Sequence, residues 1–120
     1  MDGYKLGVVE TRFAELIWQH EPLTSGELVK LCEQELQWKK STTYTVLRKL
    51  CARGVLQNRN SVVTALVARS QVQHYESEAL LVRAFDNSLP AFLAAFLSGG
   101  KKLTREEADE LKRMIEEAAK

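Results

Sequence analysis

The chain has few of the residues on which most catalytic and metal sites depend. Its 120 residues include 2 Cys and 2 His, and His20 and His74 have no other ligand residues at metal-site spacing around them. A structural metal needs several Cys or His side chains grouped together. The sequence also lacks a Gly-rich phosphate loop and a nucleophile elbow. We therefore expect no metal, no cofactor and no enzymatic activity.

Long hydrophobic runs are also missing. The longest, Leu89–Leu97, contains Pro90 and falls short of the roughly 20 residues that a membrane helix needs. The first residues, Met1–Lys5, lack the charged-then-apolar layout of a secretory signal. Cys32 and Cys51 fall on the apolar faces of helix-like patterns, where free thiols behave as small buried hydrophobes. These features predict a cytoplasmic protein with no membrane partner.

Acidic residues are absent from one stretch, Leu36–Tyr75, which holds seven basic residues. The whole chain has Lys+Arg 17 against Asp+Glu 16, so the remainder carries 10 basic and 16 acidic residues, a net charge of −6. The seven basic residues are Lys39, Lys40, Arg48, Lys49, Arg53, Arg59 and Arg69. Such a concentration favours a phosphate backbone as partner, because Lys and Arg that neutralise phosphates release condensed counterions. A solvated basic face with no partner is the alternative that charge alone leaves open.

Hydrophobic periodicity predicts three helices in the first half of the chain. The first covers Val8–His20, with apolar residues at the i, i+4, i+7 and i+8 spacing of one helix face. The second begins after Thr24, which has Glu27 at the capping-box distance. The third runs from about Ser41 to Arg53 and ends at Gly54, a residue suited to the position after a helix.

After the third helix the apolar period changes to two. Val55–Arg59 and Val62–Ala68 predict two strands joined by a turn at Asn60 and Ser61. Three helices followed by a β-hairpin is the order of a winged helix-turn-helix, whose third helix enters the major groove of DNA. Winged helices also serve as protein-interaction subunits that do not bind DNA. The lack of acidic residues around the third helix favours double-stranded DNA over that alternative.

One face of the third helix combines short hydroxyls with cations. These residue types reach phosphates and base edges. We expect Thr42, Thr45 and Lys49 to lie nearest the bases and Arg59, in the hairpin, to contact the DNA backbone. The candidate DNA-binding residues are Lys39, Lys40, Ser41, Thr42, Thr43, Thr45, Arg48, Lys49 and Arg59.

The helical pattern returns at Ser70 and continues to the end of the chain. It predicts a helix to about Asn87, a short apolar helix over Leu89–Leu97, and a last helix that opens with a capping box at Thr104. The apolar helix could complete an intrachain core, but an exposed apolar patch of this kind usually marks an interface. We expect dimerisation through Phe92, Leu93, Phe96, Leu97, Leu111, Met114 and Ile115.

The predicted fold class is therefore mostly α with a β-hairpin wing. It is a winged helix-turn-helix followed by C-terminal dimerisation helices. Residues 1–69 would form the DNA-binding domain and residues 70–120 the helical dimerisation domain.

Three segments carry a family resemblance. Lys40–Leu50 has a Thr-rich start, a Tyr-Thr pair and a basic-Leu step, and Gly54 precedes the first predicted strand. Leu16–Trp18 is an apolar-apolar-Trp run, and Leu103-Thr104 is followed by Glu107. Together they resemble the penicillinase-repressor family, which includes the β-lactamase, methicillin-resistance and copper-responsive repressors.

The resemblance implies a homodimeric transcriptional repressor on a palindromic operator. It also implies a sensor-linked protease as a partner, because such a protease cuts an Asn-Phe bond in the penicillinase-type members. Here Phe96 follows Ala95 rather than Asn. The copper-responsive members end in Cys-x-Cys motifs, and this chain has no Cys after Cys51, so the resemblance does not extend to that metal switch.

Overall fold

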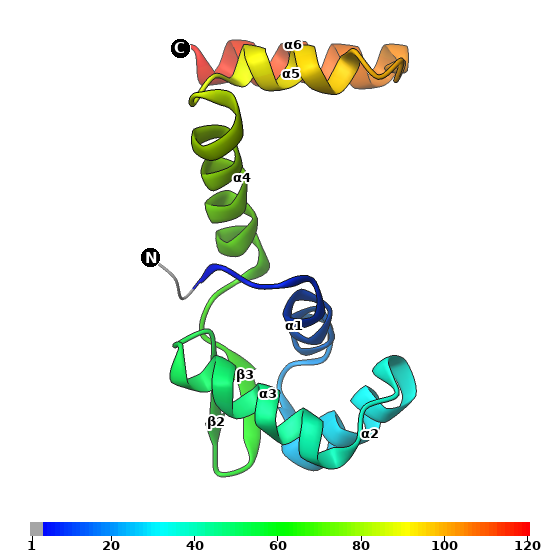
Figure 1. Ribbon diagram of the computed structural model, residues 1–120, viewed down its shortest axis with the longest axis vertical. Coiled ribbons are helices and arrows are strands. Elements are labelled where there is room, and N and C mark those ends of the chain that lie inside the picture. The colour runs from blue at the N-terminus through cyan, green and yellow to red at the C-terminus, as the bar shows by residue number, and fades with distance from the viewer. Residues whose placement is uncertain (1–3) are drawn as a thin grey trace. The chain divides into compact units, whose positions relative to one another are not determined.

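The computed structural model describes residues 4–120 as a mostly helical chain with one small sheet, which confirms the predicted fold class (Figure 1). Its elements in chain order are α1 (Val8–His20), β1 (Leu23–Thr24), α2 (Ser25–Leu36), α3 (Lys40–Ala52), β2 (Leu56–Arg59), β3 (Val62–Ala65), α4 (Arg69–Phe85), α5 (Leu89–Leu97) and α6 (Arg105–Ala118). The predicted helices are all present, with ends that differ from the prediction by a residue or two.

Two helices begin at the capping boxes that the sequence predicts. Thr24 Oγ1 accepts a hydrogen bond from the Glu27 N–H at 3.1 Å, and Glu27 Oε1 accepts one from the Thr24 N–H at 2.8 Å. Thr104 and Glu107 repeat the arrangement at the start of α6, at 3.0 and 3.1 Å. Each box satisfies two amides that have no partner within the helix, so both helices start at a residue that local sequence specifies.

The C-terminal end of α3 is set by Gly54. Its φ of 79° lies in the left-handed region, which glycine adopts without steric cost. The Val55 N–H donates to Leu50 O and the Gly54 N–H donates to Cys51 O, both at 3.0 Å. These two bonds form a Schellman motif, which turns the chain from the helix into the first strand of the wing.

The wing has one strand more than the sequence predicts. The sheet order is β1-β3-β2, all antiparallel, and Val63 of β3 lies opposite both Leu23 of β1 and Asn58 of β2. Two residues are too few to give β1 a periodic signal. Asn60 and Ser61 form the predicted turn, with φ values of 54° and 64°, the positive pair that matches hairpin twist.

The hydrophobic core lies in the first of two compact units. That unit ends at Ala79, and the second covers Leu80–Lys120. The largest fully buried side chains include Phe13, Ile17, Leu28, Leu47, Leu50 and Leu56. Val72, in α4, is 3% exposed and belongs to the same core. The start of α4 is therefore part of the first unit. The domain boundary expected between residues 69 and 70 comes earlier in the chain than the division between Ala79 and Leu80.

The second unit leaves much of its apolar surface uncovered. The structure describes α5 and α6 in full, and neither contains a buried residue. Phe92 contacts Phe85 edge to face at 5.4 Å and stacks on Phe96 at 5.9 Å between ring centroids. Among residues 4–120, no single helix is long and apolar enough to cross a bilayer. Helices α4 and α5 reach that length and composition only when they are taken together across the bend between them.

Candidate nucleic-acid interface

The exposed face of α3 carries hydroxyls followed by a guanidinium. Ser41, Thr42, Thr45 and Arg48 are all exposed, and Thr45 Oγ1 donates to Ser41 O at 2.9 Å. Part of this face borders a surface hollow of about 510 Å³, which is lined by Lys40, Ser41, Tyr44, Thr45 and Arg48. Hydroxyls, which donate and accept, and a guanidinium, which donates, thus lie on one side of the helix, and both kinds of group can hydrogen-bond base edges.

Contacts with α2 hold this face in place. The Tyr44 hydroxyl donates to Ser25 Oγ at 3.3 Å, which joins α3 to the first turn of α2. Leu47 and Leu50 are buried on the opposite side of α3. The helix is therefore fixed by its apolar side, and its polar side remains open.

The N-terminus of α3 has no side-chain cap, unlike those of α2 and α6. Lys39 occupies the cap position, and its side chain makes no capping hydrogen bond. The first amides of a helix carry partial positive charge and bind phosphate readily. Lys39 and Lys40 are both exposed beside these amides, so this end of α3 suits a phosphate group.

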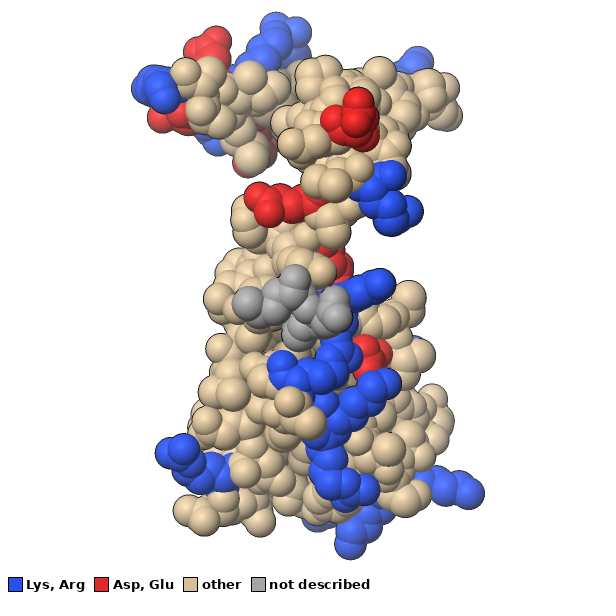
Figure 2. Space-filling model, turned by 60° about the vertical axis from the view of Figure 1, so that its left-hand side comes forward, with Lys and Arg blue, Asp and Glu red and all other residues tan. Residues whose placement is uncertain are grey.

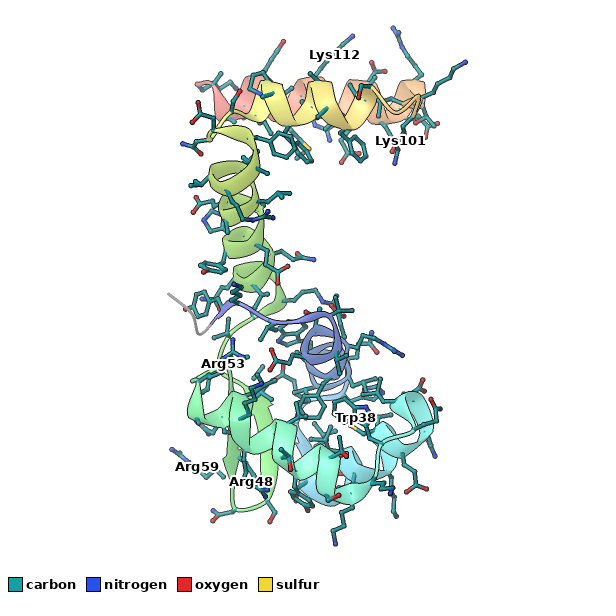
Figure 3. The ribbon with its side chains drawn as sticks, in the orientation of Figure 1. Trp38, Arg48, Arg53, Arg59, Lys101 and Lys112 are labelled. Atoms are coloured by element: carbon teal, nitrogen blue, oxygen red, sulfur yellow. The ribbon has the colours of Figure 1, made fainter. Side chains whose placement is uncertain are left out.

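Arg59 extends the interface to the wing. It is the last residue of β2 and is exposed next to the turn at Asn60 and Ser61. Figure 3 shows Arg48 and Arg59 on one side of α3 and Arg53 on the other. The Ser25 N–H donates to Ser61 O at 2.9 Å, so the turn of the wing is anchored to the start of α2.

Thr43 does not belong to this surface, contrary to the prediction from the sequence. Its side chain is 0% exposed and shares the buried face of α3 with Leu47 and Leu50. At about 100° per residue, Thr43 points in nearly the same direction as these leucines. Within the described part of the chain, its Oγ1 has no nitrogen or oxygen hydrogen-bond partner, and its polar neighbour is the buried Cys32 thiol. Thr43 is therefore unavailable to contact DNA.

A winged helix with an open basic face has a clear parallel among known proteins. The penicillinase repressor family matches residues 6–117. The chain belongs to the penicillinase repressor family. It is 27% identical over 112 residues to the penicillinase repressor of Bacillus licheniformis, a match that covers 90% of this chain and 87% of that protein. The resemblance carried by α3 is thus confirmed, and the family consists of DNA-binding transcriptional regulators rather than enzymes.

Three of the seven basic residues in the repressor's acid-free segment are paired with acids of α1. Lys49 Nζ lies 3.2 Å from Glu10 Oε2, and Arg53 Nη1 lies 3.2 Å from Glu10 Oε1. Arg69 forms an ion pair with Glu15. These acids precede the segment in the sequence but lie beside it in the fold. The net charge of the segment therefore overstates the number of its cations that lack an acidic partner and can bind DNA phosphates directly.

The remaining four cations are better candidates. Lys39, Lys40, Arg48 and Arg59 are exposed, and none forms an ion pair within residues 4–120. Basic side chains of the first unit as a whole, with an acidic side chain beside them, form the band that Figure 2 shows. These cations can neutralise phosphates without first giving up an acidic partner.

Glu10 is the residue of this region that sequence reasoning missed. Burial raises its pKa, but hydrogen bonds from the Gly7 N–H, Lys49 and Arg53 outweigh burial and leave the pKa below its usual value. The Gly7–Glu10 spacing is a local signal that could have revealed the 3.0 Å cap. The contacts with α3 depend on how the helices pack, and no local pattern reports them.

Proposed function

We propose that the protein represses transcription by binding a palindromic operator, in a sequence-specific manner, as a homodimer. The observation that carries this proposal is the exposed polar face of α3, where Arg48 forms no ion pair within residues 4–120, beside Arg59 of the wing. Family membership supplies the DNA-binding regulator. The dimer, the symmetry of the operator and the roles of individual residues are our proposals.

In the proposed complex, α3 lies in the major groove with its N-terminal half toward the bases. Thr42, Thr45 and Arg48 contact base edges. Arg48 takes the place expected for Lys49, because the Lys49 ammonium is already paired with Glu10 at 3.2 Å. Lys39, Lys40, Ser41 and the first amides of α3 bind phosphates, and Arg59 binds the backbone beyond the groove.

The proposed dimer is supported by the apolar surface of the second unit. A unit of about 40 residues rarely folds without a disulfide, a metal or a partner chain. Every residue of the buried core precedes the second unit. The proposed dimer contacts are Phe92, Leu93, Phe96, Leu97, Leu111, Met114 and Ile115. A twofold partner would cover them and present two recognition helices to half-sites about 34–36 Å apart.

A sensor-linked protease remains a proposed partner, but α5 constrains how it could act. The Ala95–Phe96 bond lies inside α5, whereas proteases prefer exposed loops. Cutting there would require α5 to unwind first. We therefore propose that any release by proteolysis depends on opening of the second unit.

Duplex binding measured against salt tests the proposal. For six phosphate contacts, the affinity should fall about a thousandfold between roughly 50 and 200 mM salt. Selection from random duplex DNA should return a palindrome whose half-sites are one helical turn apart. Binding that does not change with salt, or no binding at low salt, would contradict the proposed function.

A further inference from the structure

Glu10 holds two cations of α3 with a single carboxylate. Its Oε1 accepts from the Gly7 N–H at 3.0 Å and from Arg53 Nη1 at 3.2 Å. Its Oε2 lies 3.2 Å from Lys49 Nζ and 3.3 Å from Arg53 Nη1. Two oxygens that share one negative charge and bind a guanidinium and an ammonium reproduce what a DNA phosphate offers to the same side chains.

We propose that Glu10 is a positioning residue that determines specificity by competing with DNA phosphates for Lys49. This inference rests on the proposed DNA-binding function. By holding Lys49, Glu10 removes a cation from non-specific complexes in which the α1-facing side of α3 lies on phosphates, and it leaves the base-reading side chains untouched. Discrimination depends on the ratio of specific to non-specific affinity, so weaker non-specific binding raises that ratio.

The exposure of the three side chains identifies Lys49 as the partner that can be exchanged. The Glu10 side chain is 16% exposed and that of Arg53 is 26% exposed, whereas that of Lys49 is 63% exposed. Arg53 also donates to the carbonyl oxygen of Lys5, so it is held from two sides. An exposed ion pair is weak, and a phosphate that approaches the Lys49 ammonium could therefore replace the Glu10 carboxylate.

The arrangement around α3 explains why this competition affects selectivity. Figure 3 places Arg53 on the opposite side of α3 from Arg48 and Arg59. Glu10 therefore neutralises charge along the side that faces α1 and leaves Arg48 and Arg59 unpaired among the described residues. A repressor whose charge is confined to one side of α3 gains phosphate contacts only when that side lies on the DNA.

Glu10→Gln is the direct test, because the amide keeps an oxygen acceptor for the Gly7 N–H and removes the charge. At about 0.1 M salt, affinity for random-sequence duplex should rise roughly threefold to tenfold. The slope of log affinity against log salt should steepen by about 0.9, the value for one added phosphate contact. The ratio of specific to non-specific affinity should fall.

Glu15→Gln is the matched control. It lies on the same helix, changes the net charge equally and releases Arg69, whose guanidinium is also held 5.7 Å above the Trp18 ring. The salt slope of this variant should match that of the parent protein. An equal gain for Glu10→Gln and Glu15→Gln would show a net-charge effect and overturn the inference.

Lys49→Met separates competition from a purely structural role. In the parent background it should lower the magnitude of the salt slope by well under the roughly 0.9 of a full phosphate contact, because Glu10 competes for the ammonium. Combined with Glu10→Gln it should abolish the gain. Lys49→Met alone remains informative even if Glu10→Gln fails to fold, because a slope reduced by about one would show that Lys49 already binds phosphate. That result, or a folded Glu10→Gln protein with an unchanged slope, would overturn the inference. A parent protein whose binding is independent of salt would instead contradict the proposed function itself.

Discussion

The buried hydroxyl of Thr43 lowers the free energy of unfolding of the protein. A polar group that loses water without gaining a good partner is destabilising by about 1–3 kcal/mol. Thr43 Oγ1 has no nitrogen or oxygen partner within residues 4–120, and the neighbouring Cys32 thiol offers only a weak hydrogen bond. Thr43→Val replaces the hydroxyl with a methyl group of similar size. We expect the free energy of unfolding, measured by urea denaturation, to rise by about 1 kcal/mol and operator affinity to stay unchanged.

Thr42→Val is the matched control, since Thr42 is exposed on the same turn of α3. It should leave stability within about 0.5 kcal/mol of the parent and weaken operator binding. A loss of stability in Thr43→Val would show that the contact of the hydroxyl with the Cys32 thiol outweighs its loss of water. A loss of operator affinity would restore Thr43 to the interface.

Arg48 and Arg59 should differ in what they contribute to binding. Arg48→Ala should cost about 1–3 kcal/mol on the operator and relax the preference for one base pair. Arg59→Ala should weaken all duplexes equally and reduce the magnitude of the salt slope by about one. Fluorescence anisotropy titrations on operator and random duplex measure both effects. Equal losses on both duplexes for both variants would contradict this division of roles.

The end of α3 depends on the backbone conformation of Gly54 rather than on the space around it. Its φ is 79°, and a methyl group added there would meet nothing within 4 Å. Gly54→Ala should therefore lower the free energy of unfolding by about 1–2 kcal/mol, the cost of a left-handed alanine. Thermal or urea unfolding provides the measurement.

Gly26 offers the matched control in α2. A methyl group there would contact only Thr24 Oγ1, at 3.9 Å, and alanine favours a helix more than glycine does. Gly26→Ala should leave stability unchanged or raise it by up to about 1 kcal/mol. If both variants lost the same stability, the explanation through φ at Gly54 would fail.

Local signals account for the elements that the sequence predicts correctly. The capping boxes at Thr24 and Thr104 join residues three apart, and the Schellman motif at Gly54 is equally local. Strand β1 has two residues and is defined by its pairing with β3, far along the chain. No pattern within a short window reports such a pairing.

The exposed face of α3 could be predicted in part, again because helical periodicity is a local signal. Helical period alone orients Thr42, Thr45 and Arg48, but the cluster of hydroxyls concealed that Thr43 faces the core. The hydrogen bond from Arg53 to Glu10 spans 43 residues. Charge counted along the sequence could not anticipate that pairing, because it depends on the packing of α1 against α3.

The second unit should hold two chains together through its apolar surface. Phe92→Ser combined with Phe96→Ser should shift the protein from dimer to monomer, because each change removes an aromatic ring from the proposed interface. Binding to a palindromic operator should weaken greatly, whereas binding to a half-site should change little. Analytical ultracentrifugation at micromolar concentration measures the oligomeric state.

Leu66→Ser is the matched control, because Leu66 is an apolar side chain of the first unit and is 54% exposed. It should leave the dimer intact. A monomeric parent protein that still binds a palindromic operator tightly would contradict the dimer and assign the apolar surface another role.

The fluorescent side chains of the protein are all in one of its two units. All of its tryptophans and tyrosines lie in the first unit: Tyr4, Trp18, Trp38, Tyr44 and Tyr75. Trp18 Nε1 donates to Val67 O at 3.0 Å, and Trp38 stacks on Phe13 at 5.5 Å between ring centroids. Emission from tryptophan and tyrosine therefore reports the first unit alone. Separation of two chains at their C-terminal helices would be spectroscopically silent, whereas loosening of either indole would be visible without any added dye.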